Sequence, residues 1–313
     1  MDVSAVSAPR QDRSNLAGIA WMLLAGLFFV AVNGTVRWVG DDLPAAQSAF
    51  LRFVFGILFL VLPLAQALRT GFPAPVWRKF ILRGAIHVCA VVLWFFAMAR
   101  IPVAEVTAIG FINPIVVTAG AALFLGEPLG WRRMLAIAVA LAGALIVLRP
   151  GVRALEPGHL AQLCAAVCFG TSYLIAKQLT RVAPAGAVVA MMSLTVTIGL
   201  APLAALSWVP PSAPQLAALA LAALFGTAGH YSMTRAFQAA PMTVTQPVVF
   251  LQLIWASLLG TFAFGEGVDV WVIVGGAVMI GAISWITWRE SQQPRRGTVS
   301  PGDRPAAPAR WNG

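Results

Sequence analysis

Ten hydrophobic stretches joined by short polar segments occupy the chain from Leu16 to Trp288. Most of them approach the roughly 20 apolar residues that an α-helix needs to cross a bilayer. Charged residues make up only 10% of the chain, and none lies between Val182 and Thr234, whereas a water-soluble domain needs a far more charged surface. The sequence therefore predicts an all-α integral membrane protein with ten transmembrane helices. We expect these helices at residues 16–34, 45–68, 80–99, 103–125, 134–148, 159–176, 185–206, 215–233, 242–264 and 270–288.

The two ends of the chain differ from the rest in composition. The first apolar stretch is longer than the about 7–15 residues of a signal-peptide core, so we interpret it as an uncleaved first helix. Residues 1–15 are polar and predict a cytoplasmic N-terminal tail, and residues 290–313, with scattered Pro, Gly and Arg, predict a disordered cytoplasmic C-terminal tail. The three cysteines, Cys89, Cys164 and Cys168, lie within apolar stretches. They are expected to be small apolar residues, and no metal site is predicted.

The distribution of positive charge predicts the topology. A net charge of +10 would suggest a nucleic-acid partner for a soluble protein, but in membrane proteins Lys and Arg gather on the cytoplasmic side. With the N-terminus inside, sixteen of the 21 Lys and Arg residues fall on the inner side, and Arg52 falls within a helix. Only Arg37, Arg100, Arg149 and Arg153 fall on the outer side. We therefore expect a multi-pass protein of a bacterial inner membrane, with both termini in the cytoplasm and no nucleic-acid partner.

The second half of the chain repeats the first. Residues 102–127 align without a gap on residues 241–266 at a spacing of 139 residues, which places Asn113 opposite Gln252. Because each unit holds an odd number of helices, the second unit crosses the membrane in the opposite direction, as in the inverted repeats of many carriers. We expect two inverted five-helix repeats, at residues 16–149 and 158–289. The identical positions are Pro102 and Pro241, Phe111 and Phe250, Ile115 and Ile254, Gly126 and Gly265, and Glu127 and Glu266.

Several motifs resemble the EamA domain of the drug/metabolite transporter superfamily. In the first half they comprise the Asn-Pro and Gly-Glu-Pro motifs of residues 113–128, followed by Gly143. In the second half they comprise residues 252–266, which end in Gly-Glu, and residues 275–282; the Leu-Arg-Phe of residues 51–53 also resembles the family. The resemblance implies a ten-helix carrier whose central cavity is lined by helices one, three, four, six, eight and nine.

Ionisable side chains inside the hydrocarbon layer are candidates for function, because they are costly there unless paired or hydrated. Arg52 lies about seven residues into the second expected helix. It either pairs with backbone carbonyls or contacts an anionic group of a substrate. Glu105 lies about one turn into the fourth helix, where it either caps that helix or binds a cationic group or a coupling proton. His87 and His230, on equivalent helices of the two repeats, either titrate near physiological pH or bind a metal-bearing ligand, or they are hydrogen-bonded packing residues.

Aromatic and amide side chains complete the candidate site. An aromatic group is able to stack on a substrate or cage an amine, although most aromatic residues in membranes only pack. Asn113 and Gln252 would face each other across the repeat axis in the family geometry, where they either line the cavity or join helices. The aromatic candidates are Trp94, Tyr173, Tyr231 and Trp255.

The sequence lacks motifs for enzymatic chemistry. It has neither a His-Glu-x-x-His zinc motif nor a P-loop, so we expect no enzyme, no ATP-driven pump and no cofactor. The favoured interpretation is a secondary transporter that exports a small polar or zwitterionic metabolite, such as an amino-acid derivative or a metallophore, by alternating access. The alternatives are uptake of a cofactor-like metabolite such as S-adenosylmethionine, and flipping of a lipid headgroup. The expected partners are the substrate, membrane lipid and a coupling proton, with the chain acting as a monomer or homodimer.

Overall fold

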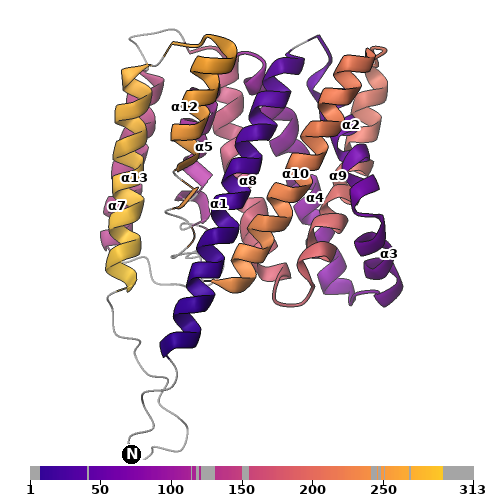
Figure 1. The fold of residues 1–313 in the computed structure, drawn as a ribbon, viewed down its shortest axis with the longest axis horizontal. Helices are drawn as coiled ribbons and strands as arrows, with labels where there is room; N and C mark the ends of the chain where they lie inside the picture. The colour runs from indigo at the N-terminus through magenta and orange to yellow at the C-terminus, as the bar shows by residue number, and fades with distance from the viewer. Residues whose placement is uncertain are drawn as a thin grey trace, which may run out of the picture.

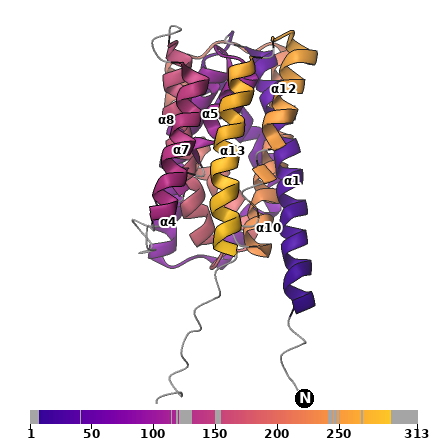
Figure 2. The same cartoon turned by 90° about the vertical axis from the view of Figure 1, so that its left-hand side faces the viewer.

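A computed structural model shows the chain as a bundle of upright helices (Figures 1 and 2). It describes residues 8–40, 42–113, 115–117, 120, 131–149, 155–240, 245, 248–249, 251–267 and 269–291, and all regular structure in these ranges is helical. The fold is thus all-α, as predicted. The helices are α1 (Ala8–Val39), α2 (Ala45–Phe59), α3 (Val61–Thr70), α4 (Ala74–Met98), α5 (Val103–Gly110), α7 (Trp131–Leu148), α8 (Pro157–Leu179), α9 (Ala185–Leu206), α10 (Ala213–Ala239), α12 (Leu251–Phe264) and α13 (Val270–Ser291).

The observed helices follow the expected spans with three differences among the described residues. Helix α5 ends at Gly110, short of the expected end at residue 125. Residues 114, 118–119 and 121–125 of that span, and residues 242–244, 246–247 and 250 of the ninth span, lie outside the described residues. Helix α1 begins at Ala8, so part of the expected N-terminal tail is helical. The prediction of one continuous helix over residues 45–68 is wrong, because α2 and α3 meet at Leu60 with a bend of 77°. Pro63 lies in the first turn of α3, where a missing N–H is tolerated, whereas the middle of a continuous helix would lose a hydrogen bond there. Most of the expected C-terminal tail lies outside the described residues.

Helix packing has a two-fold pattern that relates each helix to the one five spans later. Helix α1 packs along α10, and the related contact joins α8 to α4. The contact of α2 with α10 is likewise matched by that of α9 with α4, and α1 with α12 by α8 with α5. In three further contacts the two-fold relation exchanges the two partners with each other: α2 with α9, α5 with α12 and α7 with α13. This pattern is that of two inverted five-helix repeats, as predicted from the sequence.

Helices α7 and α13 form a close pair at one side of the bundle (Figure 1). A Cβ atom on Gly143 would lie 2.7 Å from the Gly275 carbonyl oxygen, and a Cβ on Gly275 would lie 2.5 Å from that of Gly143. Only glycine allows two helix backbones to approach this closely. These two glycines, one from each repeat, therefore fix the contact between the fifth and tenth spans.

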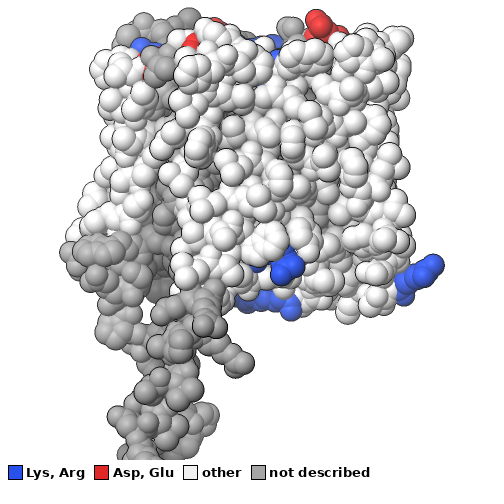
Figure 3. Space-filling model, viewed as in Figure 1, with Lys and Arg blue, Asp and Glu red and all other residues white. Residues whose placement is uncertain are grey.

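The surface of the bundle suits a lipid environment. In Figure 3 the sides are largely uncharged, basic side chains lie at the lower end, and acidic ones lie at the upper end together with a few basic ones. Large apolar residues such as Leu62, Leu206 and Phe262 are exposed on these sides. Five described helices are each long and apolar enough to cross a bilayer, and α2 with α3 adds a sixth, bent span.

Candidate functional site

A cavity of about 150 Å³ lies between the two repeats. That volume is enough for one benzene-sized ring. Six of the lining helices, α1, α4, α5, α8, α10 and α12, are those that the family resemblance implies, and α2 adds Arg52. The described lining residues are Met22, Phe29, Val32, Asn33, Arg52, His87, Val91, Trp94, Val106, Thr107, Gly110, Phe111, Asn113, Val117, Gln162, Phe169, Tyr173, His230, Met233, Phe237, Val249 and Gln252.

Arg52, His87 and His230 form a group of basic side chains in the cavity wall, which we call the Arg–His cluster. The two imidazole rings lie 5.4 Å apart between centroids, and His87 Nδ1 lies 3.0 Å from the Ser172 hydroxyl. The guanidinium of Arg52 lies 4.3 Å from the centre of the Phe53 ring. No residue that the structure describes forms a hydrogen bond or an ion pair with Arg52. The cluster thus combines three helices, α2, α4 and α10, around one permanent positive charge.

Amide and hydroxyl groups line other parts of the cavity. The Asn33 side-chain amide donates to the Thr107 hydroxyl at 3.4 Å, and that of Gln162 donates to the Val106 carbonyl at 2.9 Å. Asn113 and Gln252 both line the cavity, one from each repeat. The cavity therefore presents neutral hydrogen-bonding groups in addition to the Arg–His cluster.

Aromatic rings supply the apolar part of the wall. Phe169 stacks on Tyr173 with 6.0 Å between ring centres, and Phe29 meets His230 edge-on at 5.1 Å. Trp94 also lines the cavity. Such a wall suits a ligand with a flat ring, because rings gain contact area by stacking or by edge contacts.

Three of the residues expected from the sequence lie away from the cavity. Glu105 is buried against His159 on α8. The Tyr231 ring packs edge-on against Trp21, and its hydroxyl accepts a hydrogen bond from Arg235. Trp255 is 45% exposed on the outer surface of α12. Helix assignment alone did not reveal these orientations, because neighbouring positions on one helix point in different directions.

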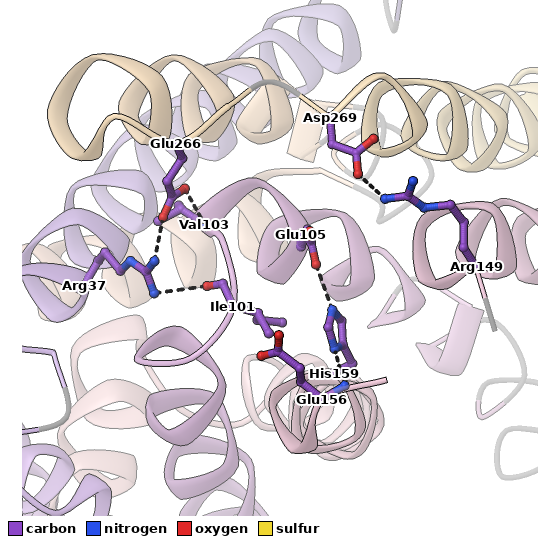
Figure 4. A network of polar contacts seen from close by, with 9 residues as sticks. All are labelled: Arg37, Ile101, Val103, Glu105, Arg149, Glu156, His159, Glu266 and Asp269. Carbon is purple, nitrogen blue, oxygen red and sulfur yellow. Dashed lines mark hydrogen bonds and ion pairs between the residues drawn. The ribbon is translucent and has the colours of Figure 1, made fainter. Parts of the chain in front are cut away.

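Three polar pairs at the upper end each join the first repeat to the second, and we call them the cross-repeat contacts (Figure 4). Arg37 Nη2 lies 2.9 Å from Glu266 Oε1, and Glu105 Oε2 lies 2.8 Å from His159 Nε2. The third pair joins Arg149 at the end of α7 to Asp269 before α13. Each pair has one member in the first five spans and one in the last five, so the two repeats are held together at this end.

The contact of His159 with Glu105 is best described as a hydrogen bond from a neutral ring. The backbone N–H of Glu156 donates to His159 Nδ1 at 3.1 Å, so this nitrogen carries no proton. The hydrogen of a neutral imidazole is then on Nε2, which donates to the Glu105 carboxylate. Both side chains are almost completely buried.

Glu266 is positioned by the glycine before it. Gly265 has a φ of 64°, a conformation that only glycine adopts readily, and it ends α12. The Glu266 N–H then donates to the Gly260 carbonyl at 3.0 Å, and its carboxylate accepts from the Val103 N–H, also at 3.0 Å. Arg37 adds a bond to the Met98 carbonyl at 2.9 Å. The Gly-Glu motif of the second repeat therefore serves as an anchor at the upper end.

Sequence reasoning missed two buried basic residues. Arg83 was expected on the inner surface but is fully buried, where it donates to the Val188 carbonyl at 2.9 Å and to Met192 Sδ at 3.1 Å. His159, the first residue of the expected span 159–176, is also fully buried. Arg83 lies inside the expected span 80–99, so the rule that singled out Arg52 would have found it. The burial of His159 has no comparable signal in the sequence.

Comparison with known proteins identifies relatives over nearly the whole chain. The model of the EamA-like transporter family matches residues 16–149 and 156–288. A riboflavin transporter of Rhizobium johnstonii is 30% identical, over 94% of this chain and 99% of that protein. An S-adenosylmethionine uptake transporter of Rickettsia prowazekii is 26% identical, over 90% of this chain and 95% of that protein. The pseudopaline exporter of Pseudomonas aeruginosa is 25% identical, over 85% of this chain and 94% of that protein.

Proposed function

The chain belongs to the EamA-like transporter family, and we propose on this premise that it carries a small, ring-bearing polar metabolite through the central cavity by alternating access. The observation that carries the proposal is the cavity itself, which is enclosed by helices of both repeats and lined by amides, aromatic rings and one arginine. Carriers built from inverted repeats bind their substrates between the repeats, near the middle of the membrane.

The composition of the cavity wall favours a neutral or anionic substrate over a cationic one. The expectation of a zwitterionic substrate depended on Glu105, which contacts His159 instead. No described carboxylate lines the cavity, whereas Arg52 does. A metabolite with a flat ring and several hydrogen-bonding groups, of the kind named in the 30% identical relative, suits this wall better than a sulfonium cation. Riboflavin is therefore the first compound to test.

The cross-repeat contacts support a mechanism in which the upper end opens and closes. Alternating access requires the two repeats to rock against each other around the site. Because all three pairs join one repeat to the other, opening at this end must break them. We take the present conformation as the one that is closed at the upper end.

The distribution of charge supports an orientation with the lower end in the cytoplasm of a bacterial cell. Basic side chains lie at that end in Figure 3, and cytoplasmic loops are enriched in Lys and Arg. The upper end then faces the periplasm. Export stays a prediction, because the relatives include both an uptake transporter and an exporter.

Substrate counterflow in proteoliposomes tests the proposed function without a choice of direction. Vesicles containing the purified carrier are loaded with unlabelled riboflavin and placed in a trace of labelled riboflavin. We expect transient accumulation of label that protein-free vesicles do not show, and S-adenosylmethionine should compete poorly for it. Accumulation of labelled S-adenosylmethionine but not of riboflavin would contradict the proposed substrate class.

A further inference from the structure

Arg52 is a buried positive charge without a counter-charge among the residues that the structure describes. The residue is only 6% exposed, and its Nε atom has no hydrogen-bond partner among the described residues. The carboxylates of the sequence other than Glu105 lie in the tails, in connecting segments or at helix ends. An unpaired ion in a protein interior is strongly destabilising, so its retention calls for a partner that the described residues do not supply.

The surroundings of Arg52 are built to accommodate its guanidinium. Gly226 on α10 faces it, and a Cβ atom there would lie 2.1 Å from Arg52 Nη2. Two neighbouring polar atoms, His87 Nε2 and His230 Nδ1, are also buried without a hydrogen-bond partner among the described residues. The equally buried Arg83 also has a partnerless Nε, but its two Nη atoms donate to a carbonyl and to a thioether. Unsatisfied polar atoms therefore gather where Arg52 meets the cavity.

We propose that Arg52 binds a carboxylate of the transported substrate, with His87 and His230 as its polar neighbours. This assignment rests on the proposed function and adds to it substrates that combine a ring with one carboxylate, a contact that uncharged riboflavin does not use. A guanidinium offers two parallel N–H groups to a carboxylate, which gives both strength and orientation. The described cavity wall has one residue that is permanently charged, so a monoanion balances it.

The aromatic wall and the cavity volume indicate the rest of the ligand. Phe29 and Phe169 each contact a histidine of the cluster edge-on, Phe29 with His230 and Phe169 with His87. A ring next to the bound carboxylate would therefore lie among aromatic side chains. The cavity volume of about 150 Å³ holds one six-membered ring in the present conformation. Benzoate has both features, and benzamide has the same shape without the charge.

Thermal unfolding of the full-length carrier in detergent measures this binding. Benzoate, benzamide and phenyl phosphate are compared at equal concentration and ionic strength, since a ligand that binds the folded state raises the midpoint. We expect benzoate to raise the midpoint more than benzamide or phenyl phosphate does. Arg52→Gln should abolish the benzoate effect, and Arg69→Gln, which changes an exposed arginine on α3, should leave it intact. Equal effects of benzoate and benzamide, no benzoate effect, or a larger effect of phenyl phosphate would overturn the proposal.

A second variant keeps the test decisive if Arg52→Gln does not fold. Gly226→Ala retains the arginine but displaces its guanidinium, because the new methyl group would occupy its place. We expect benzoate to bind at least about fivefold more weakly to this variant, and unchanged affinity would refute the assignment. Riboflavin counterflow separates the two claims: normal counterflow without a benzoate effect removes the carboxylate site and leaves the transporter.

Discussion

The upper end and the centre of the protein contain similar side chains in opposite states of pairing. At the upper end, Arg37 and Arg149 each face a carboxylate from the other repeat. In the centre, Arg52 lines the cavity and faces no carboxylate among the described residues. The same residue type thus joins the repeats in one place and is left available to a ligand in the other.

This difference follows from the positions of the acidic residues. Glu266 and Asp269 lie in the segment between α12 and α13, beside the ends of α1 and α7. The central helices α2, α4 and α10 contribute Arg52 and two histidines but no carboxylate to the cavity. A carrier needs contacts that hold a closed end and a site that only the substrate completes, and the two regions correspond to these needs.

The largest expected effect is that of Arg52→Gln on transport. Loss of one partner from a buried charge pair weakens binding by about 2–5 kcal/mol, which corresponds to a decrease of about 30-fold or more in apparent affinity. We expect the protein to remain in the membrane and counterflow of labelled benzoate, which carries the carboxylate, to fall to near background. Arg69→Gln serves as the control. Normal transport by Arg52→Gln would show that the substrate does not pair with Arg52, and that the centre offers no free positive charge to a ligand.

A moderate effect on stability is expected from substitution of Glu105, and its size depends on which residue replaces the glutamate. Gln keeps an oxygen that accepts the hydrogen bond from His159, so Glu105→Gln should retain transport and stability. Leu removes the acceptor of this buried hydrogen bond, which should lower the free energy of unfolding by about 1–3 kcal/mol. Melting of the purified variants measures the difference, with Asp42→Asn at an exposed carboxylate outside this network as control. Loss of transport in Glu105→Gln at a normal protein level would restore Glu105 as a coupling residue.

The smallest effect is the protection by substrate that we expect at the two cavity amides, Asn113 and Gln252. Asn113→Cys and Gln252→Cys, each in a background without Cys89, Cys164 and Cys168, should react with a water-soluble thiol reagent. Bound substrate should slow each reaction about two- to fivefold, because it covers the side chains without a charge contact. Absence of reaction from both sides of the membrane would assign these amides to helix contacts.

The fold was predictable because it depends on patterns that extend over many residues. Hydrophobic length and the spacing of 139 residues between repeats do not depend on the direction of any one side chain. The bend at Leu60 was missed because Pro63 lies in an otherwise apolar stretch that reads as continuous.

The candidate site was predictable only in part, because it depends on individual side-chain directions. Arg52, His87 and His230 were identified by the cost of burying such groups, and all three line the cavity. Glu105 met the same criterion, but His159, which follows 54 residues later in the chain, binds it elsewhere. That pairing requires α5 and α8 to be adjacent in space, which neither local composition nor helix length reveals.

Cross-linking of the upper end tests the central claim most directly. Arg37→Cys and Glu266→Cys replace the two members of one cross-repeat contact, in a background without the three native cysteines. If opening must separate the repeats at this end, a short bifunctional reagent that joins the two cysteines should abolish riboflavin counterflow, and a reagent with a reducible bond should allow its recovery. Each single variant treated alike should remain active. Undiminished counterflow in the fully cross-linked carrier would contradict the account.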